Sequence, residues 1–299
     1  MKGHTTAGVI LCAAFCHLKG ERRMEEKLIR EKMKKAVEDV RKTNPLAGSI
    51  TNYITVDLVA NAQLAVGGSA AMCYLTEEGE FFVEAGGAVY LNMGGLLPIL
   101  GESIPATAKK AHELGKPWVL DPVAIGIGSL RMQILKELKP YKPSIIRGNA
   151  SEIIALASYW DVYGEAGINN ARGVDSTESV DAASQAAVAL ARYTGGAVAV
   201  SGKVDLVTDG NVVARLEGGS HFMEKVTGCG CSLGGVVAVY ACVADPFIAA
   251  MTACSIYNLA GARAEAKCAG PGSFIKTFLD ELYLASPEEV ARNTFTMVE

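Results

Sequence analysis

The stretch KVTGCGCSLGGVVAVYACVA, residues 225–244, joins a glycine-spaced loop directly to an apolar helix. Gly228 and Gly230 let the backbone turn tightly without a Cβ, so the N–H groups of residues 228–231 can converge at the positive end of that helix. Such a junction favours an anion, and a transferring phosphoryl group is the ligand we expect there. The alternative is a glycine-rich helix start that serves only close packing.

Short β-branched apolar runs alternate with helical segments in the part of the chain that precedes this stretch. They predict strands at 89–92, 117–122, 143–149 and 197–202 and helices near 103–114, 131–138, 151–158 and 179–193. Apolar strands separated by crossover helices indicate an α/β fold with a mostly parallel central sheet and helices on both faces.

Two further patterns follow the last of these strands. The segment DLVTDGNVVARL, residues 205–216, predicts an antiparallel hairpin that turns at 209–211. The C-terminal third is expected to be helical and to end in a capping box at Ser286, Pro287 and Glu289. Because the chain shows no internal repeat and no linker, we expect residues 24–299 to form a single domain.

Composition and charge argue against a nucleic-acid partner. Half of the 299 residues are apolar and the net charge is −4. Basic residues concentrate on a helix expected over about 25–42, where acidic and basic residues are spaced for ion pairs, so we expect a solvated face. These expected pairs are Glu26/Arg30, Glu31/Lys35 and Glu38/Lys42.

The cysteines and the N-terminal segment bear on the compartment. Eight cysteines with four histidines show no zinc spacing, and Cys242 and Cys254 read as small buried hydrophobes in a reducing, cytoplasmic environment. The apolar stretch 7–18 is shorter than the roughly 18 residues of a membrane span, so we expect no membrane partner. We interpret residues 1–23 as a dispensable extension, with Met24 as a candidate start and a signal peptide as the alternative.

Polar residues follow the predicted strands directly. Because ligands of an open parallel sheet bind beyond the carboxyl ends of its strands, Asn92, Asp121, Arg147, Asn149 and Ser201 should share one edge. The first turn of the next helix adds Glu152 to this group.

The charges of these residues suggest their roles. Asp121 and Glu152 could hold a hydrated Mg²⁺, and Arg147 offers a planar fork for phosphate. Each also has a plainer interpretation. Asp121 could shape the turn before Pro122, Arg147 could form a structural ion pair, and Glu152 could be a solvated first-turn acid.

Six segments together resemble the bacterial hydroxyethylthiazole kinases, members of the ribokinase-like superfamily. The resemblance spans about residues 43–260, and its discriminating elements are RGNxSE and TGxGC. The segments are TNPLAGSITNYI (43–54), VAN (59–61), LDPVAIG (120–126), IIRGNASEI (145–153), SGKVD (201–205) and VTGCGC (226–231).

The resemblance implies ATP-dependent phosphorylation of the primary alcohol of 4-methyl-5-(2-hydroxyethyl)thiazole, a step of thiamine salvage. It also implies Mg²⁺ as cofactor and a homotrimer with its active sites at subunit interfaces. The implied site residues are Arg147, Ser201 and Asn149 for ATP, Met72, Gly228 and Asn52 for the thiazole alcohol, Asp121 and Glu152 for the metal, and Gly228, Cys229, Gly230 and Cys231 for the transfer itself.

Four departures from the family pattern fall on the side that we expect to face the acceptor alcohol. Gly48 stands where the family usually has His, Gly95 where it has Thr, and Ala124 where it has Gly. The segment Ser69-Ala70-Ala71-Met72 lacks the usual Pro. The phosphate-binding segments are kept, so the departures concern the identity of the alcohol.

Cys231 stands where most relatives in the superfamily have Asp. Phosphoryl transfer depends more on positioning and electrostatic stabilisation than on base strength, so a thiol is tolerable there. We expect the helix N-terminus to lower the pKa of Cys231. Its thiol would then orient the hydroxyl of the alcohol and act as a weak base.

The sequence leaves three rival functions open. They are a related kinase for a pyrimidine or pyridoxal alcohol, a nucleotide-dependent dehydratase for hydrated nicotinamide cofactors with the same fold, and a nucleotide-binding sensor without catalysis.

Overall fold

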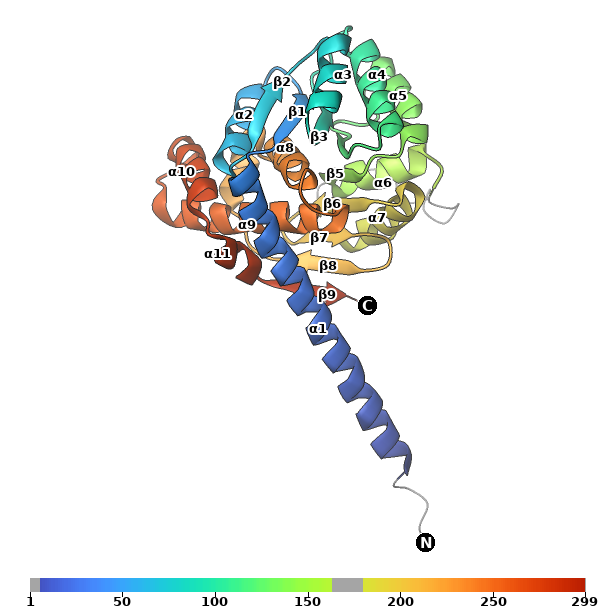
Figure 1. Ribbon diagram of the computed structural model, residues 1–299, viewed down its shortest axis with the longest axis vertical. Helices are drawn as coiled ribbons and strands as arrows, with labels where there is room; N and C mark the ends of the chain where they lie inside the picture. Colours follow the sequence, from blue (N-terminus) through green and yellow to red (C-terminus); the bar gives the residue numbers. More distant parts are fainter. Residues whose placement is uncertain (1–5, 163–179, 299) are drawn as a thin grey trace.

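One mixed sheet forms the centre of the molecule (Figure 1). The computed structural model describes the backbone of residues 6–162 and 180–298 and the side chains of residues 24–162 and 182–298. Within these residues nine strands form a single sheet in the order β2-β1-β3-β4-β5-β6-β7-β8-β9. All pairings from β2 to β6 are parallel, and those from β6 to β9 are antiparallel. The strands are β1 (Leu46–Ile50), β2 (Ser69–Met72), β3 (Ala88–Asn92), β4 (Trp118–Asp121), β5 (Ile145–Asn149), β6 (Ala197–Ser201), β7 (Asp205–Thr208), β8 (Val213–Leu216) and β9 (Phe295–Val298).

The four strands predicted from apolar runs are β3, β4, β5 and β6, and the predicted hairpin is β7 with β8. The prediction missed β1 and β2, whose small residues lack the β-branched signature. The C-terminal third does not end at the helix that Ser286 caps, because β9 follows that helix and pairs with β8. The mostly parallel α/β fold is therefore confirmed, with a longer sheet than expected.

The helices cover both faces of the sheet, as predicted. One buried apolar cluster draws on α1, α2, α8, α9, α10 and α11, and a second draws on α3 to α7. The helices are α1 (Thr6–Thr43), α2 (Val56–Ala65), α3 (Thr76–Ala85), α4 (Leu100–Glu113), α5 (Ser129–Leu138), α6 (Ala150–Tyr159), α7 (Val180–Thr194), α8 (Cys229–Ala241), α9 (Pro246–Lys267), α10 (Pro271–Leu284) and α11 (Pro287–Arg292). Helices α4 to α7 match the four predicted ones, although Ser179, where the last was expected to begin, lies outside the described residues.

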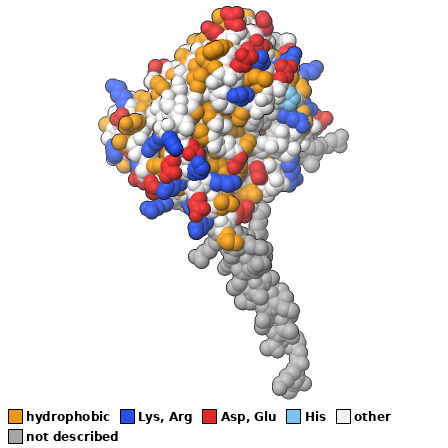
Figure 2. Space-filling view, in the orientation of Figure 1, with side chains coloured by type: hydrophobic (Ala, Val, Ile, Leu, Met, Phe, Trp, Pro, Cys, Tyr) orange, Lys and Arg blue, Asp and Glu red, His pale blue; other side chains and the backbone are white. Residues whose placement is uncertain are grey.

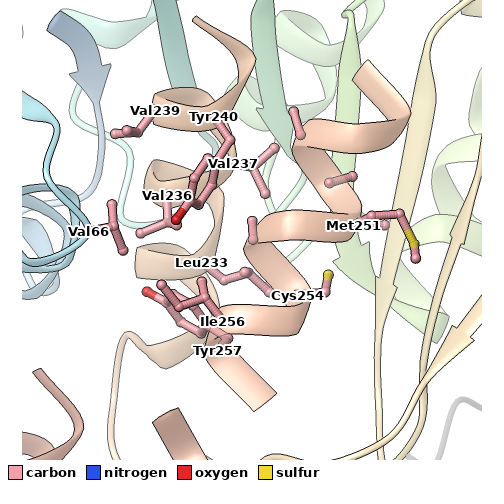
Figure 3. Close-up of a cluster of buried hydrophobic side chains, with 14 of the residues drawn as sticks. Val66, Leu233, Val236, Val237, Val239, Tyr240, Met251, Cys254, Ile256 and Tyr257 are labelled. Atoms are coloured by element: carbon pink, nitrogen blue, oxygen red, sulfur yellow. The ribbon is translucent and has the colours of Figure 1, made fainter. Parts of the chain in front are cut away.

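Helices α8 and α9 pack side by side against one face of the sheet (Figure 3). Leu233, Val236 and Val237 of α8 and Cys254 and Ile256 of α9 are almost fully buried there. A Cβ at Gly234 would come within 2.4 Å of the Tyr90 ring, so this glycine sets how closely α8 approaches β3. The apolar run after the glycine loop thus anchors the loop to the centre of the sheet.

Helix α1 has the solvated face expected from its charges, and its other face is buried. It begins at Thr6, and Met33, Val37 and Val40 are fully buried against α9 and α11. Arg30 donates to the carbonyl oxygens of Ala291 and Asn293 at 2.6 and 2.9 Å, where α11 ends.

The expected ion pairs of α1 are replaced by others. From residue 24 on, where the side chains of the helix are described, the pairs along it are Lys27–Glu31, Lys34–Glu38 and Lys35–Asp39. One face of the helix is core, and the charges beside it pair with neighbouring elements: Arg30 with the end of α11, Lys32 with Asp245 before α9, and Lys34 with Glu288 of α11. Among the described residues, no helix is long and apolar enough to cross a lipid bilayer.

Candidate active site

The strand-end residues meet at one edge of the sheet, as the parallel topology requires. In the strand register Asn92 lies opposite Asp121, and Asn149 lies opposite Ser201. The Arg147 guanidinium reaches along this edge: it donates to the Ser201 hydroxyl at 3.0 Å and to Asp121 Oδ2 at 3.4 Å. Burial alone would lower the pKa of Arg147, but the carboxylates of Asp121 and Glu152 outweigh it and raise that pKa, so the guanidinium stays charged.

Asp121 is held by a buried network that includes a residue missed at the sequence level. Its Oδ2 accepts from the Tyr90 hydroxyl at 2.8 Å and from the Asn92 amide at 3.2 Å. Burial raises the pKa of Asp121 to about 6, against the opposing charge of Arg147. The available signal for Tyr90 was its position two residues before Asn92, which puts both side chains on one face of β3.

The glycine loop lies against the Arg147 side chain. Gly228 precedes α8 in a left-handed conformation, with φ of 98°, and a Cβ there would meet Thr55 at 2.9 Å. A Cβ at Gly230 would come within 2.7 Å of both terminal nitrogens of Arg147. The positive end of α8 and a buried guanidinium therefore converge on one spot, which suits a doubly charged anion.

Cys231 lies in the first turn of α8, beside Asn52 from the loop after β1. The Asn52 amide donates to the Cys231 sulfur at 3.6 Å and to Asn92 Oδ1 at 3.1 Å. The expectation of a lowered thiol pKa is wrong: burial and the nearby Asp121 charge raise the pKa of Cys231 despite Arg147. Desolvation outweighs the helix dipole because the thiol is largely enclosed, and Cys231 therefore stays protonated near neutral pH. Cys229 is buried, and burial raises its pKa to about 11.

Glu152 has a structural role in addition to the one proposed for it. Asn149 caps α6 by accepting from the Glu152 backbone N–H at 2.9 Å, and Glu152 Oε2 accepts from the Asn149 N–H at 2.9 Å. Its other oxygen accepts from the Ala124 N–H at 3.3 Å. Ala124 itself adopts a left-handed conformation with φ of 58°, which suits the glycine usual in the family. Glu152 is thus an acid in the first turn of α6, as one interpretation expected, and it also lies beside the strand-end residues.

The four departures from the family pattern do not all lie at the site. Gly95, with φ of 50°, lies against Asn52, and Ala124 bonds Glu152, so both adjoin the site. Gly48 does not face the acceptor side as expected: a Cβ there would meet Phe82 of α3 at 2.6 Å, because the alternation along β1 turns position 48 toward that helix. Met72 ends the edge strand β2 and is half-buried.

Known proteins similar to this chain share its sequence and fold over most of its length. The profile of the hydroxyethylthiazole kinase family matches residues 37–288. This chain belongs to the hydroxyethylthiazole kinase family.

Relatives of that name are similar along most of both chains. Hydroxyethylthiazole kinase of Bifidobacterium adolescentis is 50% identical and covers 88% of this chain and 93% of its own. The hydroxyethylthiazole kinase of Bifidobacterium animalis subsp. lactis is 48% identical, and the match covers 88% of this chain and 90% of its own. The hydroxyethylthiazole kinase structure from Pyrococcus horikoshii superposes with a TM-score of 0.78 at 31% identity, covering 89% of this chain and 99% of that one.

More distant structures share the fold alone. A Staphylococcus aureus pyridoxal kinase solved with AMP-PCP and pyridoxal superposes with a TM-score of 0.53 at 16% identity, covering 73% of this chain and 88% of its own. The ribokinase-like fold and the enzyme class of hydroxyethylthiazole kinase expected from the six segments are thus confirmed.

Proposed function

We propose that this member of the family transfers the γ-phosphoryl group of ATP to the hydroxyethyl side chain of 4-methyl-5-(2-hydroxyethyl)thiazole, as a step of thiamine synthesis or salvage. The observation that carries the proposal is the contact between Gly230 and the Arg147 guanidinium at the start of α8. A buried, permanently charged fork below the positive end of a helix matches the charge that spreads over a transferring phosphoryl group.

The residues divide the work by position. Arg147 and Ser201 bind ATP phosphates, and the loop at residues 228–230 receives the transferring group. Asn149 lies at the nucleotide side of the edge and acts by capping α6. Asn52, Met72 and Gly228 face the acceptor, and the thiol of Cys231 orients its hydroxyl. Because burial raises the pKa of Cys231, its thiol stays protonated and is not the base. In a loose transition state the alcohol proton can instead pass to an oxygen of the transferred phosphoryl group as the new P–O bond forms.

The carboxylates fit Mg²⁺. The described residues include no group of three or more His, Cys, Asp or Glu side chains placed to hold a metal. Mg²⁺ in phosphoryl transfer, however, takes one or two carboxylates and fills its shell with water and phosphate. Glu152 is half-buried and accessible, whereas buried Asp121 keeps one oxygen, Oδ1, without a hydrogen-bond partner. Glu152 and Asp121 are the residues that would hold the ion, and when bound it would supply positive charge against the phosphates.

We further propose a homotrimer whose active sites lie at subunit interfaces. The edge strand β2 is half-buried throughout, and Tyr53 and Ile54, next to Asn52, are 58% and 64% exposed. Figure 2 shows a band of apolar side chains over the part of the molecule where β1 and β2 lie in Figure 1. A partner subunit on this edge would cover these side chains and close the acceptor side of the site.

The decisive experiment measures ADP release from ATP with three alcohols in turn: the thiazole alcohol, pyridoxal and a hydroxymethylpyrimidine. We expect kcat/KM for the thiazole alcohol to exceed the others by about a hundredfold or more. A preference for pyridoxal or the pyrimidine would assign the rival kinase activity. ATP binding without ADP release would assign the sensor, and dehydration of a hydrated nicotinamide cofactor would assign the lyase.

A further inference from the structure

A second buried carboxylate lies at the same edge of the sheet, outside the residues assigned above. Asp205 is the first residue of β7, and the strand register places it opposite Leu216, the last residue of β8. It is only 7% exposed, and burial raises its pKa to about 6. A buried carboxylate destabilises the folded state unless its oxygens accept hydrogen bonds. The hydrogen bonds that Asp205 accepts therefore indicate its role.

The two carboxylate oxygens of Asp205 tie together two segments that are distant in the chain. Oδ1 accepts from the backbone N–H of Gly202 at 3.0 Å, which fixes the turn between β6 and β7. Oδ2 accepts from the side-chain amide of Asn258 in α9, also at 3.0 Å. Gly202 directly follows Ser201, whose hydroxyl accepts from Arg147. The carboxylate therefore holds the backbone that presents Ser201.

Asn258 in turn fixes the segment that leads to the phosphate loop. Its backbone oxygen accepts from the Gly219 N–H at 3.0 Å. Gly218 and Gly219 have φ of 127° and 82°, and a Cβ at Gly218 would come within 2.9 Å of Asn258 Cβ. The glycines thus allow this segment to lie directly on α9 before it reaches Gly228.

We propose that Asp205 and Asn258 form a clamp that positions the phosphate-binding side of the site: Asp205 through the turn behind Ser201, and Asn258 through the segment that leads to the loop at residues 228–230, which receives the transferring phosphoryl group. Both are positioning residues. The clamp rests on the proposed kinase function and deepens it, because it serves the binding of ATP, and none of its hydrogen bonds involves the acceptor residues Asn52 and Met72. Its effect comes from hydrogen-bond geometry and not from the negative charge.

The experiment compares Asp205→Ala, Asp205→Asn and a matched control in the same hairpin. Asp209 also accepts backbone N–H groups, those of Asn211 and Val212 at 2.8 Å each, but in the turn at the opposite end of β7, so Asp209→Ala serves as control. Each variant is characterised by KM for ATP and for the thiazole alcohol, by calorimetric titration with AMP-PCP and Mg²⁺, and by its melting temperature.

We expect Asp205→Ala to raise KM for ATP and Kd for AMP-PCP about tenfold, with KM for the alcohol changed less than about twofold. Asp205→Asn should stay within about threefold of wild type. Its oxygen can still accept from Gly202, and its amide can donate to Asn258 once that side chain flips. Asp209→Ala should leave all three constants unchanged.

Several results would overturn the clamp. One is an Asp205→Ala variant whose KM for ATP and Kd for AMP-PCP are unchanged. Another is an Asp205→Ala variant in which KM for ATP and KM for the thiazole alcohol rise by the same factor. A loss in Asp205→Asn as large as that in Asp205→Ala would assign the effect to charge. If Asp205→Ala does not fold, Asn258→Ala is the second variant; it keeps the Gly202 bond, and it should raise Kd for AMP-PCP several-fold. Wild-type turnover tests the proposed function separately, since the AMP-PCP titration decides the clamp whatever the acceptor is.

Discussion

At the scale of single residues, Glu152 combines a helix cap with a charge at the proposed phosphate site. Its carboxylate accepts from the N–H groups of Asn149 and Ala124, and it contributes to the raised pKa of Arg147. Replacement by Ala would remove the cap together with the charge. Replacement by Gln removes the charge but lets the amide oxygen keep the capping-box bond from Asn149 at 2.9 Å, at the loss of the longer 3.3 Å bond from Ala124.

We therefore predict that Glu152→Gln lowers kcat by on the order of a hundredfold while the melting temperature changes little. The matched control is Glu289→Gln in the capping box of α11, where Glu289 accepts from the Ser286 N–H at 2.9 Å and also pairs with Arg263. That variant should lose some stability and keep its turnover. Full activity in Glu152→Gln would remove Glu152 from the metal and phosphate site.

Cys231 tests how much a base contributes. With the thiol pKa raised by burial, the protonated form prevails up to the ordinary cysteine pKa, so the thiol should remain mostly protonated as the pH rises from 7 to 8.5. We predict that Cys231→Ala loses less activity than Glu152→Gln and shows the same pH profile as wild type over that range. Cys231→Asp, which places a carboxylate at the acceptor hydroxyl, should remain active. An inactive but well-folded Cys231→Asp enzyme would contradict the position assigned to residue 231.

At the scale of elements, the start of α8 depends on a glycine that leaves room for Arg147. We predict that Gly230→Ala lowers kcat/KM for ATP by about tenfold or more, because its Cβ would displace the guanidinium that it meets at 2.7 Å. Gly272 occupies the same position, second in its helix, in α10, and a Cβ there meets nothing within 4 Å. Gly272→Ala should keep full activity and an equal or slightly higher melting temperature. Equal kinetics in the two variants would refute the contact.

The strands show what could be predicted from the sequence and what could not. The strands β3 to β6 are buried on both faces and read as apolar runs, which is why the strand ends at Asn92, Asp121 and Ser201 could be located. The strand β1 was missed because Gly48 stands where a β-branched residue would have marked the strand. Phe82 of α3 fills the space that a side chain at position 48 would occupy, and this tertiary contact cannot be seen in the local sequence.

The residues missed at the site have a common cause. Asp205 and Asn258 are 53 residues apart, and only the packing of α9 on the sheet brings them together. The raised pKa of Cys231 likewise follows from burial by other elements, whereas its place at a helix start suggested the opposite shift.

At the scale of the whole molecule, the boundary at Met24 remains a prediction. In α1 the deeply buried side chains described begin with Ile29 and include Met33, Val37 and Val40. A chain that starts at Met24 keeps all of these, and we expect it to fold and to turn over like the full chain. A chain that starts at Asn44 lacks them and should be insoluble or unfolded. Solubility, circular dichroism and kcat of the two chains provide the test, and an inactive Met24 chain would make residues 1–23 part of the enzyme.

The proposed trimer links assembly to catalysis, because the exposed side chains of Tyr53 and Ile54 adjoin Asn52 at the acceptor side. Sedimentation should give about three times the 31.4 kDa chain mass. Ile54→Glu should dissociate the trimer and lower activity in parallel, since a charge at a covered apolar position costs binding free energy. Val298, 39% exposed, lies in β9, the strand at the other edge of the sheet from β2. Val298→Glu should leave mass and activity unchanged. A fully active monomer in either wild type or Ile54→Glu would show that each subunit completes its own site.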